Sequence, residues 1–127
     1  MSASHLPPNW QGRLLAVVGA SPTYHEGHRL LDAWAQAEGG TARWNPLNTT
    51  FPLPGATDYN RVGVKNYVRP TEGVCATALT LVNGFYNGIL ASLQTGTKTA
   101  EQIVQSCRAE FVKWGTNPDA IEAVLAE

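Results

Sequence analysis

The sequence predicts an α+β fold that is predominantly helical and carries one short β-hairpin. Apolar residues recur at helical spacing before Gly39 and again from Thr71 onward. Between these regions, residues 41–69 lose that period and are interrupted by proline and glycine. Only the last part of this segment is rich in β-branched and aromatic residues, as a strand would be. Helices on both sides of one irregular excursion are typical of an α+β domain.

Each predicted element begins or ends at a recognisable residue. We expect helices over residues 10–18, 24–38, 71–82, 86–94 and 100–114, a last helix from Pro118 on, and a hairpin that pairs residues 56–60 with 61–68. Thr23 with Glu26, and Thr99 with Gln102, have the spacing of capping boxes. The first two helices are separated by a short link, so we expect them to pack as a hairpin.

We assign residues 9–127 to a single domain and residues 1–8 to an extended N-terminal arm, in which two prolines oppose helix. A chain of 127 residues can bury a sizeable core. It is 43% hydrophobic and 15% charged, so we expect it to fold without metals or disulfides. Cys75 and Cys107 fall inside predicted helices, where buried thiols are the expectation and a disulfide is the alternative.

The composition argues against several classes of function. The formal net charge of −1 disfavours nucleic-acid binding, which requires a basic surface. The apolar runs are too short to span a bilayer, and residues 1–10 lack the features of a secretory signal. If the protein acts outside the cell that makes it, another component must deliver it. His25 and His28 do not match the H-E-x-x-H zinc pattern, so we expect neither a metal site nor a cofactor.

The segment most informative about function is the predicted helix that ends at Glu38. Leu30, Trp34 and Glu38 lie four residues apart on one face, and Gly39 and Gly40 end the helix. A carboxylate in the last turn opposes the helix dipole, and flanking Trp34 and Leu30 exclude water. Both effects raise a carboxyl pKa. A carboxyl that stays protonated near neutral pH is what a general acid requires. The alternative is a surface glutamate that points into solvent.

The irregular segment that follows is dense in polar side chains able to hydrogen-bond a sugar. These are Asn45, Asn48, Thr49, Thr50, Thr57, Asp58 and Asn60, interleaved with Trp44, Phe51 and Tyr59. Flat apolar rings beside amides and hydroxyls suit a carbohydrate, whose faces are apolar and whose rim carries hydroxyl groups. The alternative is a loop held together by its own side-chain-to-backbone hydrogen bonds.

Three stretches of sequence carry a family resemblance. They are A-E-G-G with A-R-W-N-P-L-N-T-T, then P-G-A-T-D-Y-N-R-V-G-V-K-N-Y, then G-V-C-A-T-A-L-T-L-V-N-G-F-Y-N-G-I. Within a span of about residues 24–96, the chain resembles small lysozyme-superfamily domains encoded by phages of actinobacteria and by their hosts. In that superfamily a helix ends in a catalytic glutamate, a small β-region follows, and a buried helix runs through the centre. The resemblance therefore implies a lysozyme-like fold.

The same resemblance implies a substrate and a set of site residues. The implied activity is cleavage of the β-1,4 bond between peptidoglycan sugars, with Glu38 in the place of the general acid. The implied cleft residues are Asn48, Thr49, Thr50, Gly63 and Val64, flanked by Tyr67, and the loop pattern adds Trp44 and Tyr59 as sugar contacts. Glycosidases commonly use a second carboxylate, and Asp58 is the only acid between Glu38 and Glu72.

Three functions fit these features. The first is a phage lysin or virion-associated wall hydrolase, of lysozyme or lytic transglycosylase type, that resides in the virion or the host cytoplasm and acts at the bacterial cell wall. The second is a catalytically silent virion protein, for example of the tail or capsid, with other virion proteins as partners. The third is a module that binds glycan strands without cutting them. We prefer the first, because a glutamate kept at an unfavourable helix position calls for a functional reason.

Overall fold

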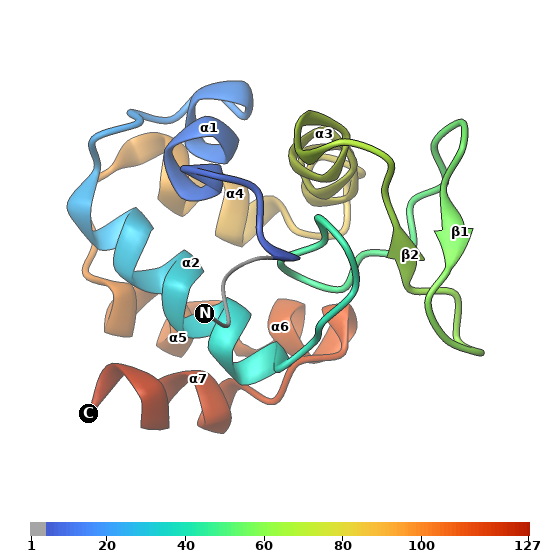
Figure 1. Ribbon diagram of the computed structural model, residues 1–127. Helices are drawn as coiled ribbons and strands as arrows, with labels where there is room; N and C mark the ends of the chain where they lie inside the picture. Colours follow the sequence, from blue (N-terminus) through green and yellow to red (C-terminus); the bar gives the residue numbers. More distant parts are fainter. Residues whose placement is uncertain (1–4) are drawn as a thin grey trace.

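The structure is a computed structural model and describes residues 5–127 (Figure 1). Its elements are α1 (Trp10–Val17), α2 (His25–Glu38), β1 (Thr57–Asp58), β2 (Lys65–Asn66), α3 (Pro70–Leu81), α4 (Asn87–Thr95), α5 (Ala100–Ser106), α6 (Arg108–Trp114) and α7 (Pro118–Leu125). The predicted class is confirmed: helices dominate, and a two-stranded antiparallel sheet lies between α2 and α3 in the sequence.

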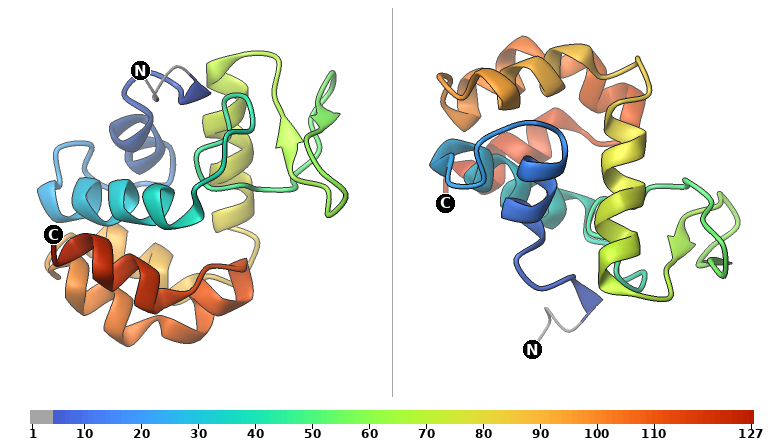
Figure 2. Two further views of the ribbon diagram at one scale, coloured as in Figure 1. Left: turned by 60° about the horizontal axis from the view of Figure 1, so that its bottom comes forward. Right: turned by 90° about the horizontal axis from the view of Figure 1, so that it is seen from above.

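The helix α2 is the central element of the helical body. It packs against α1, α5 and α7, and Figure 2 shows α7 running alongside it. The helix α3 stands across the direction of α2 and packs against α1, with the hairpin on its far side (Figure 2). The C-terminal end of α2 leads directly into the loop that carries the chain past α3 to the hairpin (Figure 1).

The core around α2 is built from the periodic apolar residues that predicted the helix. Leu30, Leu31 and Trp34 are all 0% exposed. The Trp34 ring meets Phe111 and Trp114 edge to face, with ring centroids 4.8 and 4.9 Å away. Such pairs contribute about 0.5–1.5 kcal/mol each beyond the burial of apolar area. This aromatic cluster joins α2 to α6, and so brings the end of α2 close to the turn between α6 and α7.

The predicted hairpin is confirmed, with strands shorter than expected. Thr57 pairs with Asn66, and Asp58 pairs with Lys65, in antiparallel register. Each strand has two residues. Beyond them the loop bonds to itself, because Asn60 accepts a hydrogen bond from the backbone N–H of Val64 at 3.1 Å. That side-chain bond takes the place of one hydrogen bond of the next rung; the other, from the backbone N–H of Tyr59 to the carbonyl of Val64, is present at 2.7 Å.

The predicted capping box at the start of α2 is wrong. The helix begins at His25, and the Thr23 hydroxyl pairs instead with Ser21, 3.1 Å away. Glu26 reaches out of the helix and accepts a hydrogen bond from the backbone N–H of Ala100, at the start of α5. The carboxylate therefore caps a helix distant in sequence. Local spacing does not reveal such a partner, because the contact exists only after α2 and α5 have packed together. The other predicted capping box, at the start of α5, is confirmed.

The segment predicted as one helix over residues 100–114 is divided into α5 and α6. Cys107 leaves helical geometry, with φ −118° and ψ 23°, after Ser106 bonds its hydroxyl back to the preceding turn. The bend directs Glu110 to the start of α4, where it accepts hydrogen bonds from the backbone N–H groups of Gly88 and Ile89 at 2.9 and 2.8 Å. The break at Cys107 is thus accompanied by a cap on α4 that Glu110 supplies from a distant part of the chain.

The two cysteines are unpaired, and only one is buried as expected. Cys107 is buried in the core, whereas Cys75 is exposed on α3. The residues of α3 that meet the core, which include Val74 and Ala78, lie on the adjoining face of the helix. The expectation of a buried thiol at position 75 is therefore wrong, because the small residues of α3 gave no clear face in the sequence.

The predicted N-terminal arm is tied to the domain where the structure describes it. Residues 1–4 lie outside the described residues. The backbone N–H of Trp44 donates to the carbonyl of His5 at 2.7 Å, and Leu6 packs against the core. The arm from His5 onward therefore supports the loop that follows α2.

Gly73 of α3 allows the loop at Trp44 to approach the helix backbone closely. A Cβ at position 73 would lie 1.6 Å from the Trp44 carbonyl oxygen. We expect Gly73→Ala to push this loop away and to lower the free energy of unfolding by about 1–3 kcal/mol, the usual cost of overpacking. Urea unfolding measures the change. In the control Gly12→Ala, on α1, the nearest atom would be 3.4 Å away, so stability should hold or rise. Equal stability of the two variants would contradict this account.

Candidate functional site

Glu38 is the last residue of α2, and Gly39 follows it in the left-handed conformation with φ 63°. Its side chain continues the buried face of the helix and is half-buried, rather than pointing freely into solvent. Both carboxyl oxygens accept hydrogen bonds. Oε1 accepts from Nδ2 of Asn48 at 2.9 Å, and Oε2 accepts from the hydroxyl of Thr116. The acid is thus held between two neutral donors.

Thr116 connects Glu38 to the aromatic core. Its side chain is buried in the turn between α6 and α7, and its hydroxyl oxygen accepts a hydrogen bond from Nε1 of Trp34 at 2.9 Å. The hydroxyl proton goes in turn to Oε2 of Glu38. Two residues one turn apart on α2 are therefore bridged by a residue from the C-terminal part of the chain. This bridge fixes the rotamer of the acid.

Asn48 holds the other oxygen of Glu38 from the loop. Its backbone is in the left-handed region with φ 58°, which asparagine tolerates better than most residues. Its amide lies directly against Gly40, because a Cβ at position 40 would be 2.1 Å from Oδ1 of Asn48. The second glycine of the pair is therefore needed for Asn48 to reach the acid. The sequence predicted Asn48 as a sugar contact, and the structure adds a contact with Glu38 itself.

Burial raises the pKa of Glu38 above its ordinary value, in the predicted direction. Hydrogen bonds from Thr116 and Asn48, with the indole N–H of Trp34 behind Thr116, favour the ionised form and offset part of this effect. The carboxyl therefore keeps its proton to a higher pH than an exposed glutamate does. A carboxyl that keeps its proton longer is better placed to donate that proton to a bound ligand.

The loop after α2 is held by its own side chains, which was the alternative to sugar binding for this segment. Asn45 is buried, and its Nδ2 donates to the carbonyls of Thr49 and Lys65 at 2.9 and 2.8 Å. Its Oδ1 accepts from the backbone N–H of Thr49 at 3.0 Å. The Thr49 hydroxyl, also buried, bonds to Thr80 of α3. These bonds fix the loop between α3 and the hairpin, and with it the position of Asn48.

Asp58, the predicted second carboxylate, belongs to a different set of contacts. Its side chain on β1 is 67% exposed and pairs with Lys65 of β2 at 2.5 Å. No hydrogen bond among residues 5–127 joins Asp58 to Glu38 or to the donors that hold Glu38. The catalytic role of Asp58 stays a prediction, and it would require the ion pair with Lys65 to open.

Three of the predicted binding residues lie at an accessible edge of the loop and hairpin. Tyr59 is 43% exposed, and its hydroxyl bonds to that of Thr41, shortly after the end of α2, at 2.6 Å. Thr50 is exposed and lies against Gly63, since a Cβ at position 63 would be 3.8 Å from Cγ2 of Thr50. The Tyr59 bond ties the hairpin back to the chain that leaves Glu38.

The remaining predicted binding residues have side chains that support the loop. Val64 and Tyr67 are 7% and 1% exposed, and the Tyr67 hydroxyl donates to the carbonyl of Phe51 at 2.6 Å. Burial raises the pKa of Tyr67, so the phenol remains a donor. Trp44 is half-buried, with the Arg43 guanidinium 5.8 Å from the centroid of its ring. Glycan contacts from these three side chains stay a prediction.

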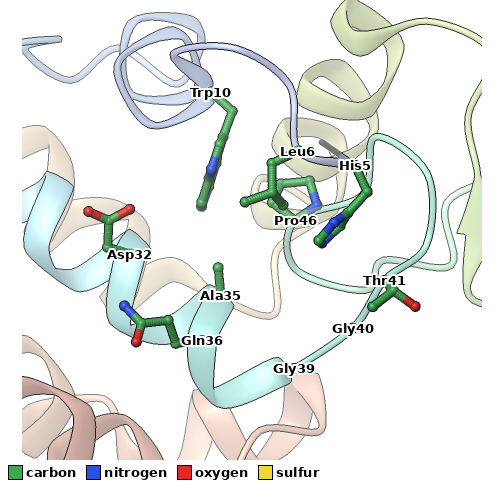
Figure 3. Close-up of a pocket in the computed structure, with 10 residues that line it drawn as sticks. All are labelled: His5, Leu6, Trp10, Asp32, Ala35, Gln36, Gly39, Gly40, Thr41 and Pro46. Atoms are coloured by element: carbon green, nitrogen blue, oxygen red, sulfur yellow. The ribbon is translucent and has the colours of Figure 1, made fainter. Parts of the chain in front are cut away.

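Two hollows adjoin the neighbours of Glu38. The first, of about 320 Å³, is lined by Val112, Gly115, Thr116, Asn117 and Pro118. The second, of about 380 Å³, is lined by His5, Leu6, Trp10, Asp32, Ala35, Gln36, Gly39, Gly40, Thr41 and Pro46. Figure 3 shows the Trp10 ring reaching from α1 toward Ala35 across this second space. Glu38 lines neither hollow, but its partner Thr116 forms a wall of the first.

Thr116 is the site residue that sequence reasoning missed. It lies 78 residues after Glu38, and nothing in its local spacing connects the two. The available signal was weak: a hydroxyl residue in the G-T-N-P turn between two apolar helices. Within residues 5–127, no group of three or more His, Cys, Asp or Glu side chains is placed to hold a metal ion. In that same range, none of the helices combines the length and the apolar character needed to cross a membrane.

Comparisons of the chain with protein-family models, with curated proteins and with solved structures found no match. The fold and the site therefore define its class in physical terms. It is a mainly helical α+β domain in which a central helix ends in a half-buried glutamate held between two neutral hydrogen-bond donors.

Proposed function

We propose that the protein cleaves the glycan strands of peptidoglycan, as a lysozyme-type hydrolase or a lytic transglycosylase, with Glu38 as general acid. The observation that carries the proposal is the half-buried Glu38 carboxyl, whose pKa is raised by burial and whose two oxygens are held by Asn48 and Thr116. A glutamate without a function gains more from solvent than from this position. The substrate class comes from the resemblance of residues 24–96 to lysozyme-superfamily domains.

In the proposed step, Glu38 gives its carboxyl proton to the glycosidic oxygen. The new O–H bond forms as the bond from that oxygen to the anomeric carbon breaks, and the bonding electron pair stays with the oxygen. The sugar acquires oxocarbenium character, and Glu38 becomes a carboxylate. Either water or a hydroxyl of the same sugar then attacks the anomeric carbon, and Glu38 takes up the proton that the nucleophile loses.

The state of Asp58 bears on which nucleophile attacks. With Asp58 paired to Lys65, Glu38 is the acid and base of the site without a second carboxylate in its network. A single acid–base group favours the transglycosylase outcome, in which a hydroxyl already attached to the sugar attacks and no water has to be activated. Direct hydrolysis would make Asp58→Asn strongly inactivating, whereas the transglycosylase route would leave that variant nearly as active as the wild type.

The second candidate is a catalytically silent lysozyme-like protein of a phage virion. The observation that favours it is again the Asp58–Lys65 pair, together with the burial of Val64 and Tyr67, which were expected to line the cleft. A module that binds glycan without cutting it belongs to the same alternative. Under the preferred proposal, the protein is a phage lysin or a virion-associated wall hydrolase that acts at the bacterial cell wall.

The test is the clearing of purified actinobacterial peptidoglycan by the wild-type protein, followed by turbidity across roughly pH 4 to 8. We expect clearing that declines as pH rises, because the acid form of Glu38 is lost. Mass spectrometry of the fragments separates the two routes, since transglycosylase products lack the water that hydrolysis adds. Intact peptidoglycan at every pH would move the conclusion to the silent protein. Sedimentation of the protein with intact walls would then identify the glycan-binding module.

A further inference from the structure

The hydrogen bonds that reach Oε2 of Glu38 have a fixed direction: Trp34 donates to Thr116, and Thr116 donates to Glu38. The indole nitrogen of Trp34 has one proton and no acceptor capacity, so it must donate to Thr116, 2.9 Å away. The Thr116 hydroxyl is buried, and among the described residues the acceptor in reach of its proton is Glu38. If Oε2 carried a proton and donated it to Thr116, the buried hydroxyl proton of Thr116 would lose its acceptor. An unpaired buried donor is costly.

The other carboxyl oxygen of Glu38, Oε1, faces a partner that can either donate or accept a hydrogen bond. Asn48 carries a donor, Nδ2, and an acceptor, Oδ1, on one amide. In the structure, Nδ2 donates to Oε1 of Glu38 at 2.9 Å, and Oδ1 is buried without a partner. A half-turn of the amide would bring the acceptor to Oε1. Oε1 can therefore form a hydrogen bond with Asn48 whether Glu38 is ionised or protonated.

From this asymmetry we infer that Thr116, held by Trp34, is a positioning residue that keeps Oε2 of Glu38 as an acceptor, so that the acid proton is carried on Oε1, toward Asn48. Under the proposed function, the proton then faces the loop that precedes the exposed Thr50, and the glycosidic oxygen should approach from that side. Only this catalytic consequence rests on the proposed function. The position of the proton is a property of the site whether or not the protein cuts glycan.

The groups packed against the Glu38 carboxyl are neutral. They are Trp34 from α2, Asn48 from the loop, and Thr116 from the turn before α7. Among the described residues, the ion pairs do not include Glu38. The charged residues closest in sequence to Thr116 have other partners: Lys113 lies over the Phe85 ring, and Asp119 pairs with Arg108. A titration observed at Glu38 therefore reports on this hydrogen-bond network.

The first test follows Glu38 and Trp34 together by NMR. The side-chain carboxyl carbon of Glu38 and the indole N–H of Trp34 are titrated in the wild type, Thr116→Val, Thr116→Ser and Asn48→Ala. In the wild type, both signals should share one midpoint. Thr116→Val should raise the Glu38 midpoint, because a donor to the carboxylate is lost, and should end the response of Trp34. Thr116→Ser should restore both. In Asn48→Ala, Trp34 should still follow Glu38, although the midpoint also moves.

The second test locates the proton by infrared spectroscopy. The C=O stretch of protonated Glu38 is identified as the band that Glu38→Gln removes. If Oε2 is the carbonyl oxygen, Thr116→Val should move this band to higher frequency, because the carbonyl loses a donor, while Asn48→Ala should leave it nearly in place. The reverse pattern would put the proton on Oε2 and overturn the inference.

The outcomes separate this inference from the proposed function. If the wild type leaves peptidoglycan intact, the proposed function fails, and the NMR and infrared results still decide the place of the proton. If the protein cuts, the alkaline limb of its pH profile should move with the Glu38 midpoint in Thr116→Val and return in Thr116→Ser.

An unchanged midpoint in Thr116→Val, or a Trp34 signal that does not change as Glu38 titrates in the wild type, overturns the role of Thr116. If Thr116→Val does not fold, Trp34→Phe decides: it keeps a ring and removes the N–H, and it should also raise the midpoint.

Discussion

Glu38→Gln is expected to slow peptidoglycan cleavage by about 100- to 10,000-fold, the usual contribution of general acid catalysis. The amide keeps the shape of the acid and removes its ionisable proton. Its oxygen can accept from Thr116 in the place of Oε2, and its nitrogen can donate to Oδ1 of Asn48, which has no partner in the wild type. The variant therefore resembles the protonated acid, and we expect its fold and glycan binding to persist. Turbidity measures the rate, and co-sedimentation with walls measures binding.

The control for this variant is the same chemical change on the surface. Glu101→Gln removes a carboxylate whose side chain is 54% exposed and pairs with Arg29, and it should leave the rate unchanged. A Glu38→Gln protein that clears walls as fast as the wild type would end the general-acid proposal. Equal loss in both variants would point to an effect on folding rather than on chemistry.

The stability of Glu38→Gln should differ from the wild type in a pH-dependent way. Burial raises the pKa of Glu38 in the folded state, so the folded protein holds this proton more tightly than the unfolded chain does. Stability contributed by the protonated group is therefore lost as pH rises from the unfolded pKa through the folded pKa. Below that window the two proteins should be about equally stable. Above it, Glu38→Gln should be the more stable, and about 0.3–1 kcal/mol of the gain should come from the helix dipole. Urea unfolding at several pH values measures this difference.

Asn45→Ala should be the most destabilising single change in the loop, by about 3 kcal/mol. The substitution removes the amide that satisfies the Lys65 carbonyl and the backbone N–H of Thr49, whereas the Thr49 carbonyl keeps its hydrogen bond from the backbone N–H of Lys65 at 3.2 Å. Each buried group left unpaired costs about 1–3 kcal/mol, and entry of water recovers part of that. For a domain of this size, the melting temperature should fall by roughly 10 °C. Activity should fall as well, because Asn48 lies in the same loop and holds Oε1 of Glu38.

Asn60→Ala is the matched control for this prediction. Asn60 is an exposed residue of the hairpin loop, and its side chain accepts one hydrogen bond, from the backbone N–H of Val64 at 3.1 Å. Its loss should cost about 1 kcal/mol or less, since water can replace the bond. Thermal unfolding followed by circular dichroism compares the two variants. A melting temperature for Asn45→Ala within experimental error of that for Asn60→Ala would show that the buried amide does not hold the loop.

The elements that local patterns predicted well are those in which neighbouring residues satisfy one another. Thr99 and Gln102 cap the start of α5 reciprocally, as their spacing indicates. Asn117 accepts a hydrogen bond from the backbone N–H of Asp119 at the start of α7, at 2.9 Å. The face shared by Trp34 and Glu38 on α2 follows directly from the period of the helix. These features depend on residues within a turn or two of one another, so the sequence displays them.

Two predictions failed because a distant partner replaced a near one. Glu26 has the right spacing to cap its own helix, but it bonds to the start of α5. The break at Cys107 accompanies the contact of Glu110 with α4, a contact between segments about one helix apart in the chain. The packed helices offered the carboxylate backbone N–H groups that otherwise lack a partner, and satisfying those groups outweighs the local bond.

By itself, the sequence determined the helical α+β class, the hairpin, and the placement of Glu38 at the end of a helix on its apolar face. The tertiary structure alone decided what holds that acid. Thr116 meets Glu38 because the aromatic contacts of Trp34 with Phe111 and Trp114 bring the end of α6 against α2. Hydrogen-bond partners that far apart leave no spacing pattern in the chain, since their distance is set by the packing of helices and not by the residues between them.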